Sequence, residues 1–353
     1  MRHFPHGPLT ALALMLALTA CASPATPAPA ASTFTPLPPP TGTPEPVHLT
    51  VGVLSFMSTL PVHIAVEKGY FAEQGLDVEL VGFGTSDRDM VPALLQGQLD
   101  VGATTPGPAV LNAIALGNTS KFVADKSAIL PEAACFSEAM VARSALLDDG
   151  TLDSLEGLRG LTITDTRGNF AEWATDRMLE EAGLTEDDLE VVDVRDNATR
   201  LEAMRSGTLD VTHLAEPWIT RFEQAGVGRL WLPDARWFPN YSTGSIIFGP
   251  AMLERDRDIG VRFMAAYLQA VAAYNEGKTD ENVAMAASFT QLEPEELRQV
   301  CWPSFQPDGL IDVTQMMAFQ EWALENGHID TVLPIEQVWD PTYVQEAAVL
   351  LGR

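Results

Sequence analysis

From Val47 onward, short apolar segments alternate with segments that have the spacing of helices. Residues 49–54 form an apolar run with the length of a buried strand, residues 60–73 have a helical pattern that Gly75 ends, and residues 77–81 form the next strand. Alternation of this kind predicts a mostly parallel sheet with helices on its faces. The predicted fold class is therefore α/β.

An internal similarity predicts two such units. The helix-to-strand junction at 94–101 ends in Leu-Asp-Val, and so does the junction at 203–211, which lies 110 residues later when measured from Asp100 to Asp210. A small residue followed by glycine is a common way to leave a helix, so one match would carry little weight. The Gly-Leu pairs that begin at 75 and 183 give a second match in the same order, which predicts two lobes of like topology.

Two strands are expected to connect the lobes. Residues 135–143 read as a strand that leads out of the first unit, and residues 243–249 as a strand that leads back. After this point only helices are expected, at about 256–276, 280–290, 293–300, 313–326 and 343–351. This organisation predicts that residues 48–137 and 246–353 form lobe 1 and that residues 138–245 form lobe 2. Each lobe would be a mixed, mostly parallel sheet flanked by helices, with the two crossover strands as a hinge and the cleft between the lobes as the ligand site.

The first twenty residues have the layout of a secretory signal peptide. Arg2 precedes an apolar run over 9–20 that is too short to span a bilayer, and Leu-Thr-Ala at 18–20 leads directly into Cys21. This ending is similar to a bacterial lipobox, in which the cysteine receives a lipid and becomes the first residue of the mature chain. We expect residues 1–20 to be removed and Cys21 to attach the protein to the extracytoplasmic face of the cell membrane. A plain signal peptide that happens to contain Cys21 is the alternative.

A proline-rich segment follows the lipobox. Nine of the 25 prolines lie between Pro24 and Pro46, with small residues and threonine between them. Such a segment cannot bury a core and is typical of a semi-rigid, extended spacer. Residues 21–47 are therefore expected to tether a folded body to the membrane.

Two further cysteines, Cys135 and Cys301, leave two alternatives open. Outside the cytoplasm they can form a disulfide, or they can be separate buried thiols. Because nothing in the sequence brings them together, we favour separate thiols.

The charge and the motifs exclude several classes of protein. The chain has 48 Asp and Glu against 21 Lys and Arg, a net charge of −27, which would repel nucleic acid. The six histidines have no metal-ligand spacing with one another, and the sequence has no phosphate-binding glycine loop, no Cys-x-x-Cys pair and no nucleophile elbow. We therefore expect no metal, no cofactor and no catalysis.

One segment carries a family resemblance. Residues 67–80, Glu-Lys-Gly-Tyr-Phe-Ala-Glu-Gln-Gly-Leu-Asp-Val-Glu-Leu, resemble the signature of the NMT1/THI5-like binding proteins, which serve ABC importers for nitrate, sulfonates, taurine and the pyrimidine precursor of thiamine. Residues 155–160 and the pair Glu216-Pro217 fit the same pattern. The resemblance covers most of the chain from about residue 49. It implies the two-lobed fold of type II periplasmic binding proteins, a small-molecule ligand, and the permease and ATPase subunits of an importer as partners.

The candidate ligand site consists of loops at the carboxyl ends of strands, where open α/β sheets bind ligands. Hydroxyls and helix N-termini in these loops suit an acceptor or anionic group, and Arg167 suits a carboxylate, sulfonate or phosphate, although a surface salt bridge explains it almost equally well. Glu216 can accept hydrogen bonds from ligand N–H groups, and Trp218 can stack on a planar ring. The candidates are Ser55, Phe56, Met57, Thr104, Thr105, Thr166, Arg167, Asn169, Phe170, Glu216, Trp218 and Tyr241.

The aromatic character of these candidates favours a nitrogen heterocycle, such as a thiamine-precursor pyrimidine or a flavin-like vitamin. A carboxylate at Glu216 is unfavourable for nitrate, bicarbonate or a sulfonate, which remain the alternative ligands. A pyrimidine-forming enzyme of the same superfamily and a sensor module are the alternative functions. The export signal argues against the enzyme, and a sensor would need a separate signalling partner.

Overall fold

The computed structural model describes residues 45–84, 86–164, 168–194 and 196–353. The predicted signal peptide, the lipidation site Cys21 and nearly all of the tether lie outside these residues, as do the candidates Thr166 and Arg167. In the described part of the chain, no helix combines the length and the apolar character needed to cross a membrane.

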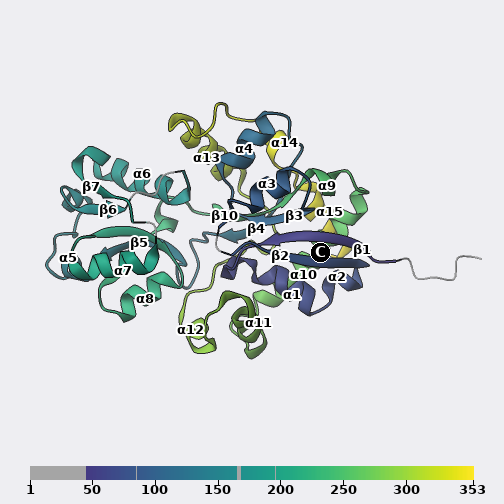
Figure 1. Ribbon diagram of the computed structural model, residues 1–353, viewed down its shortest axis with the longest axis horizontal. Coiled ribbons are helices and arrows are strands. Elements are labelled where there is room, and N and C mark those ends of the chain that lie inside the picture. The colour runs from purple at the N-terminus through teal and green to yellow at the C-terminus, as the bar shows by residue number, and fades with distance from the viewer. Residues whose placement is uncertain (1–44, 85, 165–167, 195) are drawn as a thin grey trace, which may run out of the picture. The chain divides into compact units, whose positions relative to one another are not determined.

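The body contains two five-stranded sheets with the same strand arrangement (Figure 1). The first has the order β2-β1-β3-β10-β4, and the second has the order β7-β6-β8-β5-β9. In each sheet the first three strands are parallel and the fourth is antiparallel to both of its neighbours. The strands of the first sheet are β1 (Val47–Val53), β2 (Leu76–Gly82), β3 (Val101–Thr104), β4 (Lys121–Ala128) and β10 (Ser242–Phe248). Those of the second are β5 (Glu138–Arg143), β6 (Thr162–Thr164), β7 (Glu190–Val192), β8 (Val211–Ala215) and β9 (Gly228–Pro233). The predicted α/β fold class, with two mixed and mostly parallel sheets, is confirmed.

The chain passes from the first sheet to the second through residues 129–137 and returns through residues 234–241. The strand that follows each passage, β5 or β10, occupies the antiparallel fourth position of its sheet. Residues 242–245 pair with β4 in the first sheet, although the division predicted from the sequence assigns them to lobe 2. Strand pairing determines which sheet these residues join, and their pairing partners in β4 lie more than 100 positions away in the chain.

The repeated aspartates explain the internal similarity. Asp100 accepts hydrogen bonds from the backbone N–H of Thr50 in β1 (2.9 Å) and from Nε of Arg255 (2.8 Å). Asp210 accepts the equivalent bonds from the backbone N–H of Thr162 (3.0 Å) and from Nε of Arg143 (2.9 Å). Both aspartates are nearly fully buried, so each carboxylate requires such partners. Each Leu-Asp-Val junction therefore attaches the central strand of its sheet to an arginine.

Helices cover both faces of each sheet (Figure 1). Around the first sheet, α1, α2 and α10 pack together, and α3 packs against α4. The helices of this part are α1 (Leu60–Glu67), α2 (Tyr70–Glu73), α3 (Met90–Leu95), α4 (Pro108–Ala115), α9 (Pro250–Leu253), α10 (Arg257–Tyr274), α11 (Asp280–Thr290), α12 (Pro294–Gln299), α13 (Val313–Glu325), α14 (Ile335–Val338) and α15 (Thr342–Leu350). The second sheet has α5 (Ser144–Asp148), α6 (Phe170–Ala182), α7 (Asn197–Ser206) and α8 (Trp218–Gln224). Short 3₁₀ helices are η1 (Met57–Thr59), η2 (Leu155–Leu158), η3 (Glu186–Asp188) and η4 (Asp234–Arg236).

The single helix predicted over 60–73 is two helices in the structure. Gly69 has a φ of 76°, a left-handed conformation that glycine adopts without steric cost, and it separates α1 from α2. The apolar pattern runs through the break because both helices pack on α10. Periodicity alone therefore does not reveal the interruption.

Cys135 and Cys301 form a disulfide, so the favoured interpretation of separate thiols is wrong. Cys135 lies in the first connecting segment, and Cys301 follows α12, 166 positions later. The bond joins two segments whose proximity only the tertiary fold determines.

Candidate functional site

A cavity of about 220 Å³ is lined by residues from both sheets. From the first sheet and its loops come Phe56, Met57, Ser58, Thr105, Ser127, Thr243 and Pro303; from the second come Ser137, Glu138, Phe170, Ala215 and Glu216. Phe56 and Thr105 follow the carboxyl ends of β1 and β3, and Glu216 follows that of β8. Open α/β sheets bind ligands at this edge. We take this cavity as the candidate site.

Apolar side chains provide part of the lining. Phe56 is 39% exposed, a high value for a large apolar side chain. Phe170, the first residue of α6, is held in place from behind, because Tyr241 stacks on it with ring centroids 5.0 Å apart and planes at 15°. Phe238 packs on the same ring at 5.0 Å. The aromatic face that Phe170 contributes to the cavity is thus fixed before a ligand arrives.

A buried lysine lies behind the polar part of the lining. Lys126 is 1% exposed, and its Nζ donates a 2.8 Å hydrogen bond to Oγ of Ser58, a residue of the cavity wall. Burial lowers the pKa of Lys126 to about 8, although Asp125, Glu138 and Asp87 counteract part of the effect. A Cβ added at Gly244 would lie 2.9 Å from Cε of Lys126, so the absence of a side chain at 244 is what leaves room for the lysine. Because Oγ of Ser58 accepts from Lys126, the Ser58 hydroxyl can donate its own hydrogen to an acceptor atom of a ligand.

A second titratable group, Glu138, contributes directly to the lining. Burial and the neighbouring Asp234 raise the pKa of Glu138, and His213, Thr243 and Lys126 oppose this shift. Behind Glu138, Nε2 of His213 lies 2.8 Å from Oδ2 of Asp234. Burial lowers the pKa of His213, but Asp234 and Glu138 raise it by more, so the net direction is upward. The site thus has a carboxyl group with a buried histidine–aspartate pair behind it.

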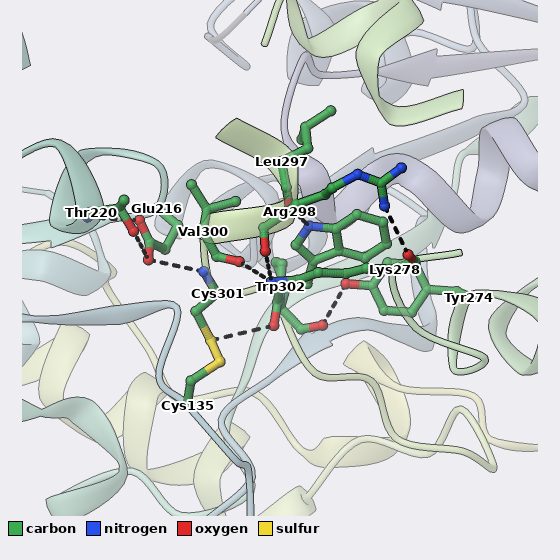
Figure 2. Close-up of a disulfide and its surroundings, with 11 residues drawn as sticks. Cys135, Glu216, Thr220, Tyr274, Lys278, Leu297, Arg298, Val300, Cys301 and Trp302 are labelled. Carbon is green, nitrogen blue, oxygen red and sulfur yellow. Dashed lines mark hydrogen bonds between the residues drawn. A yellow bond between two sulfur atoms is a disulfide. The ribbon is translucent and has the colours of Figure 1, made fainter. Parts of the chain in front are cut away.

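The carboxylate of Glu216 is largely engaged within the protein (Figure 2). It accepts hydrogen bonds from the backbone N–H of Thr220 (3.0 Å), from Oγ1 of Thr220 (2.8 Å) and from the backbone N–H of Cys301 (3.0 Å). Cys301 is bonded to Cys135, and Pro303, two residues further on, lines the cavity. The disulfide and Glu216 therefore hold one wall of the cavity, and Glu216 has less capacity for a ligand than the sequence indicates.

The structure brings together some of the residues predicted from the sequence. Phe56, Met57, Thr105, Phe170 and Glu216 line the cavity. The other described candidates lie outside its lining. Thr104 is fully buried, and Tyr241 lies behind Phe170. Asn169 caps α6 by accepting from the N–H of Ala171.

Trp218 also lies away from the lining, where Arg221 stacks over its ring at 4.8 Å and the ring packs on the smaller core of the second sheet. Ser55 is half-buried beside the lining residue Phe56.

Sequence reasoning missed Ser58, Lys126, Ser127, Glu138 and Thr243. Ser58 lies in the same loop as the candidates Phe56 and Met57. The other four lie within or at the start of strands β4, β5 and β10, whereas the general rule for open sheets points to loops after parallel strands. A lysine within residues 122–129, where apolar residues flank Asp125, Lys126 and Ser127, was an available signal, because lysine is almost never fully buried without a partner.

Two α/β units with a ligand-sized cavity between their sheets define the fold of a periplasmic-type binding protein. The family described as NMT1/THI5 like matches residues 57–277, more than half of the chain, so the chain belongs to this family. The resemblance drawn from residues 67–80 is thereby confirmed.

Relatives agree with this assignment. The chain is 20% identical over 302 residues to the "Putative binding protein YtlA" of Bacillus subtilis (strain 168), covering 79% of this chain and 83% of YtlA. It is also similar to the crystal structure of the periplasmic aliphatic sulphonate binding protein SsuA of Escherichia coli, with a TM-score of 0.68, 16% identity, and 85% of this chain and 93% of SsuA covered.

The same fold also occurs in an enzyme. The desulfurization enzyme DSZB matches with a TM-score of 0.62 and 13% identity, covering 87% of this chain and all of the DSZB chain. The fold alone therefore does not separate binding from catalysis, and the residues of the cavity have to make this distinction.

Proposed function

We propose that this protein is the solute-binding component of an ABC importer, which captures a small organic molecule outside the cytoplasm and delivers it to permease and ATPase subunits. The observation that carries the proposal is the cavity lined by both sheets, whose wall combines two phenylalanine rings with hydroxyl and carboxyl groups. Membership of the NMT1/THI5-like family and the likeness to a sulphonate-binding protein support it. The parts around the two sheets would act as lobes that move about residues 129–137 and 234–241.

The ligand we propose is a nitrogen heterocycle. Phe170, fixed against Tyr241, offers a flat face for a ring, and Glu138 offers a carboxyl group to ligand N–H groups. Lys126, through Ser58, offers a donor to a ring nitrogen or a carbonyl. A volume of about 220 Å³ is below the roughly 300–1,000 Å³ of sites for drug-sized ligands. We therefore favour a single ring, such as a thiamine-precursor pyrimidine, over a flavin-like vitamin.

Small anions are the second candidate class, and Lys126 is the observation that favours them. A buried ammonium group next to a serine hydroxyl suits nitrate, bicarbonate or the sulfonate group of taurine. Glu138 and Glu216 in the same lining oppose an anion. We rank this class below the heterocycles for that reason.

Export and anchoring are part of the proposal. Cleavage after residue 20, lipidation of Cys21 and the proline-rich tether over 21–47 would hold the binding body outside the membrane, within reach of the importer. Metabolic labelling of the expressing cells with a fatty-acid analogue tests this step. Label should enter the native chain and be absent from a Cys21→Ala variant; equal labelling of both would contradict it.

A thermal-shift panel tests the binding function. Purified protein is heated with pyrimidines, flavins, alkanesulfonates, taurine, nitrate and bicarbonate, and a ligand raises the melting temperature by mass action. We expect a pyrimidine to give the largest shift and to be recovered unchanged after incubation. Shifts by inorganic anions alone would overturn the heterocycle, and formation of a product would overturn the binding function.

A further inference from the structure

We propose that Glu138, His213 and Asp234 form a binding site for a divalent transition-metal ion of the zinc class, next to the ligand cavity. One ligand atom from each residue can be chosen so that all three atoms lie within 4.8 Å of one another. An imidazole nitrogen with two carboxylate oxygens is a ligand set that zinc accepts. Magnesium and calcium favour sites made only of oxygen ligands, so the histidine points to zinc.

The register of the second sheet explains why these three residues meet. His213 in β8 pairs with Met140 in β5, so its side chain lies on the same sheet face as that of Glu138, two residues before Met140. On the other side of β5, Ala139 pairs with Pro233, and Asp234 follows directly. Residues from three adjacent strands therefore come together, and Glu138 connects them to the cavity.

An unpartnered oxygen indicates that the protein alone does not complete this cluster. Asp234 is fully buried, and its Oδ2 is paired with Nε2 of His213 at 2.8 Å. Its Oδ1 is also buried and has no hydrogen-bond partner among the residues that the structure describes. An unsatisfied buried carboxylate oxygen is unfavourable, and a metal ion supplies the missing partner.

The charges around the cluster favour a cation in one respect and oppose it in another. Two carboxylates and a neutral imidazole would together balance one divalent ion. Lys126 and Arg200 face the cluster and oppose a further cation, and Nη1 of Arg200 is already engaged with the backbone oxygen of His213 at 3.3 Å. A metal bound at Nε2 of His213 would replace the hydrogen bond between that nitrogen and Oδ2 of Asp234.

Access to the cluster is from the cavity side. Glu138 lines the cavity, whereas Asp234 is fully buried and His213 is 7% exposed. A metal held here would have a coordination position that an anionic or nitrogen-donor group of the solute can occupy. This last step rests on the proposed function, whereas metal binding itself does not.

Zinc titration of the full chain, after removal of metal with a chelator, tests the proposal. We expect one zinc ion per chain by calorimetry and by elemental analysis, with affinity at least about tenfold weaker in His213→Gln and in Glu138→Gln. His48→Gln is the matched control, because His48 also lies beside two carboxylates, Asp77 at 2.9 Å and Glu79 at 3.5 Å, but on the exposed surface. Affinity unchanged in both cavity variants, or no zinc binding by the native chain, would overturn the proposal.

Cobalt substitution keeps the test decisive if a variant is unstable. Cobalt in the native chain should give visible d–d absorption that Glu138→Gln alters, and melting curves without metal show whether this variant folds like the native chain. A spectrum changed by His48→Gln and unchanged by Glu138→Gln would assign the metal to the surface. Because these measurements need no solute, a negative result would contradict the metal site without contradicting the importer function.

Discussion

Breaking the disulfide between Cys135 and Cys301 should lower both the stability of the protein and its affinity for ligand. The bond closes a loop whose ends are 166 residues apart. For a loop of that length the chain-entropy relation gives a stabilisation of about 5 kcal/mol at 25 °C, as an upper value. Native disulfides removed by mutation have cost roughly 2–5 kcal/mol. We expect a Cys135→Ser/Cys301→Ser variant to lose free energy of unfolding in that range.

The cavity should also loosen in this variant. The backbone N–H of Cys301 donates to Glu216, and Pro303 belongs to the lining, so a freed segment no longer holds that wall. Urea unfolding gives the change in stability from the transition midpoint and slope. Each single serine variant should match the double variant, because either one breaks the bond. Thiol titration first checks that the disulfide of the native chain is formed. Unfolding curves that then coincide for the native chain and the double variant would refute this reasoning.

Three further changes have defined outcomes. Phe170→Ala should weaken binding of the solute by about tenfold or more in calorimetry, since it removes the ring held by Tyr241. Trp218→Ala is the control and should leave the affinity unchanged, because Trp218 lies outside the cavity lining. Lys126→Met should abolish most of the affinity without lowering the melting temperature, since an apolar group replaces a buried charge; a retained affinity would remove the lysine from the account. Burial lowers the pKa of His63 to about 4, so below a pH of about 6.5 this histidine takes up a proton in the unfolded chain but not in the folded one. The free energy of unfolding should therefore fall by roughly 3 kcal/mol at most as the pH drops from about 6.5 to 4, and His63→Leu should flatten this part of the pH–stability curve.

The sequence predicts the fold well because local signals and global topology agree. The strand predicted over 49–54 is β1 (Val47–Val53), and the similarity between the Asp100 and Asp210 junctions corresponds to two sheets with one strand order. Strand and helix propensities, together with glycines that end helices, determine these features locally. The break at Gly69 and the placement of residues 242–245 depend on packing and pairing, which periodicity does not report.

The site is predictable only in part. Loops that follow parallel strands supply Phe56, Thr105 and Phe170, as expected from the general rule for open sheets. Glu138 and Lys126 lie in strands whose facing residues are set by register with distant partners, so even the unusual lysine at 126 does not show from the sequence which cavity it lies beside. The prediction of separate thiols was wrong for the same reason, because the two cysteines of the disulfide are 166 positions apart and only the tertiary fold brings them together.

The most direct test of the central claim is a crystal structure of the protein with the compound that raises its melting temperature most. We predict density for a single ring in the cavity between the two sheets, in contact with Phe170 and within hydrogen-bond distance of Glu138 or Ser58. A ligand bound elsewhere on the chain, with this cavity filled only by water, would contradict the account.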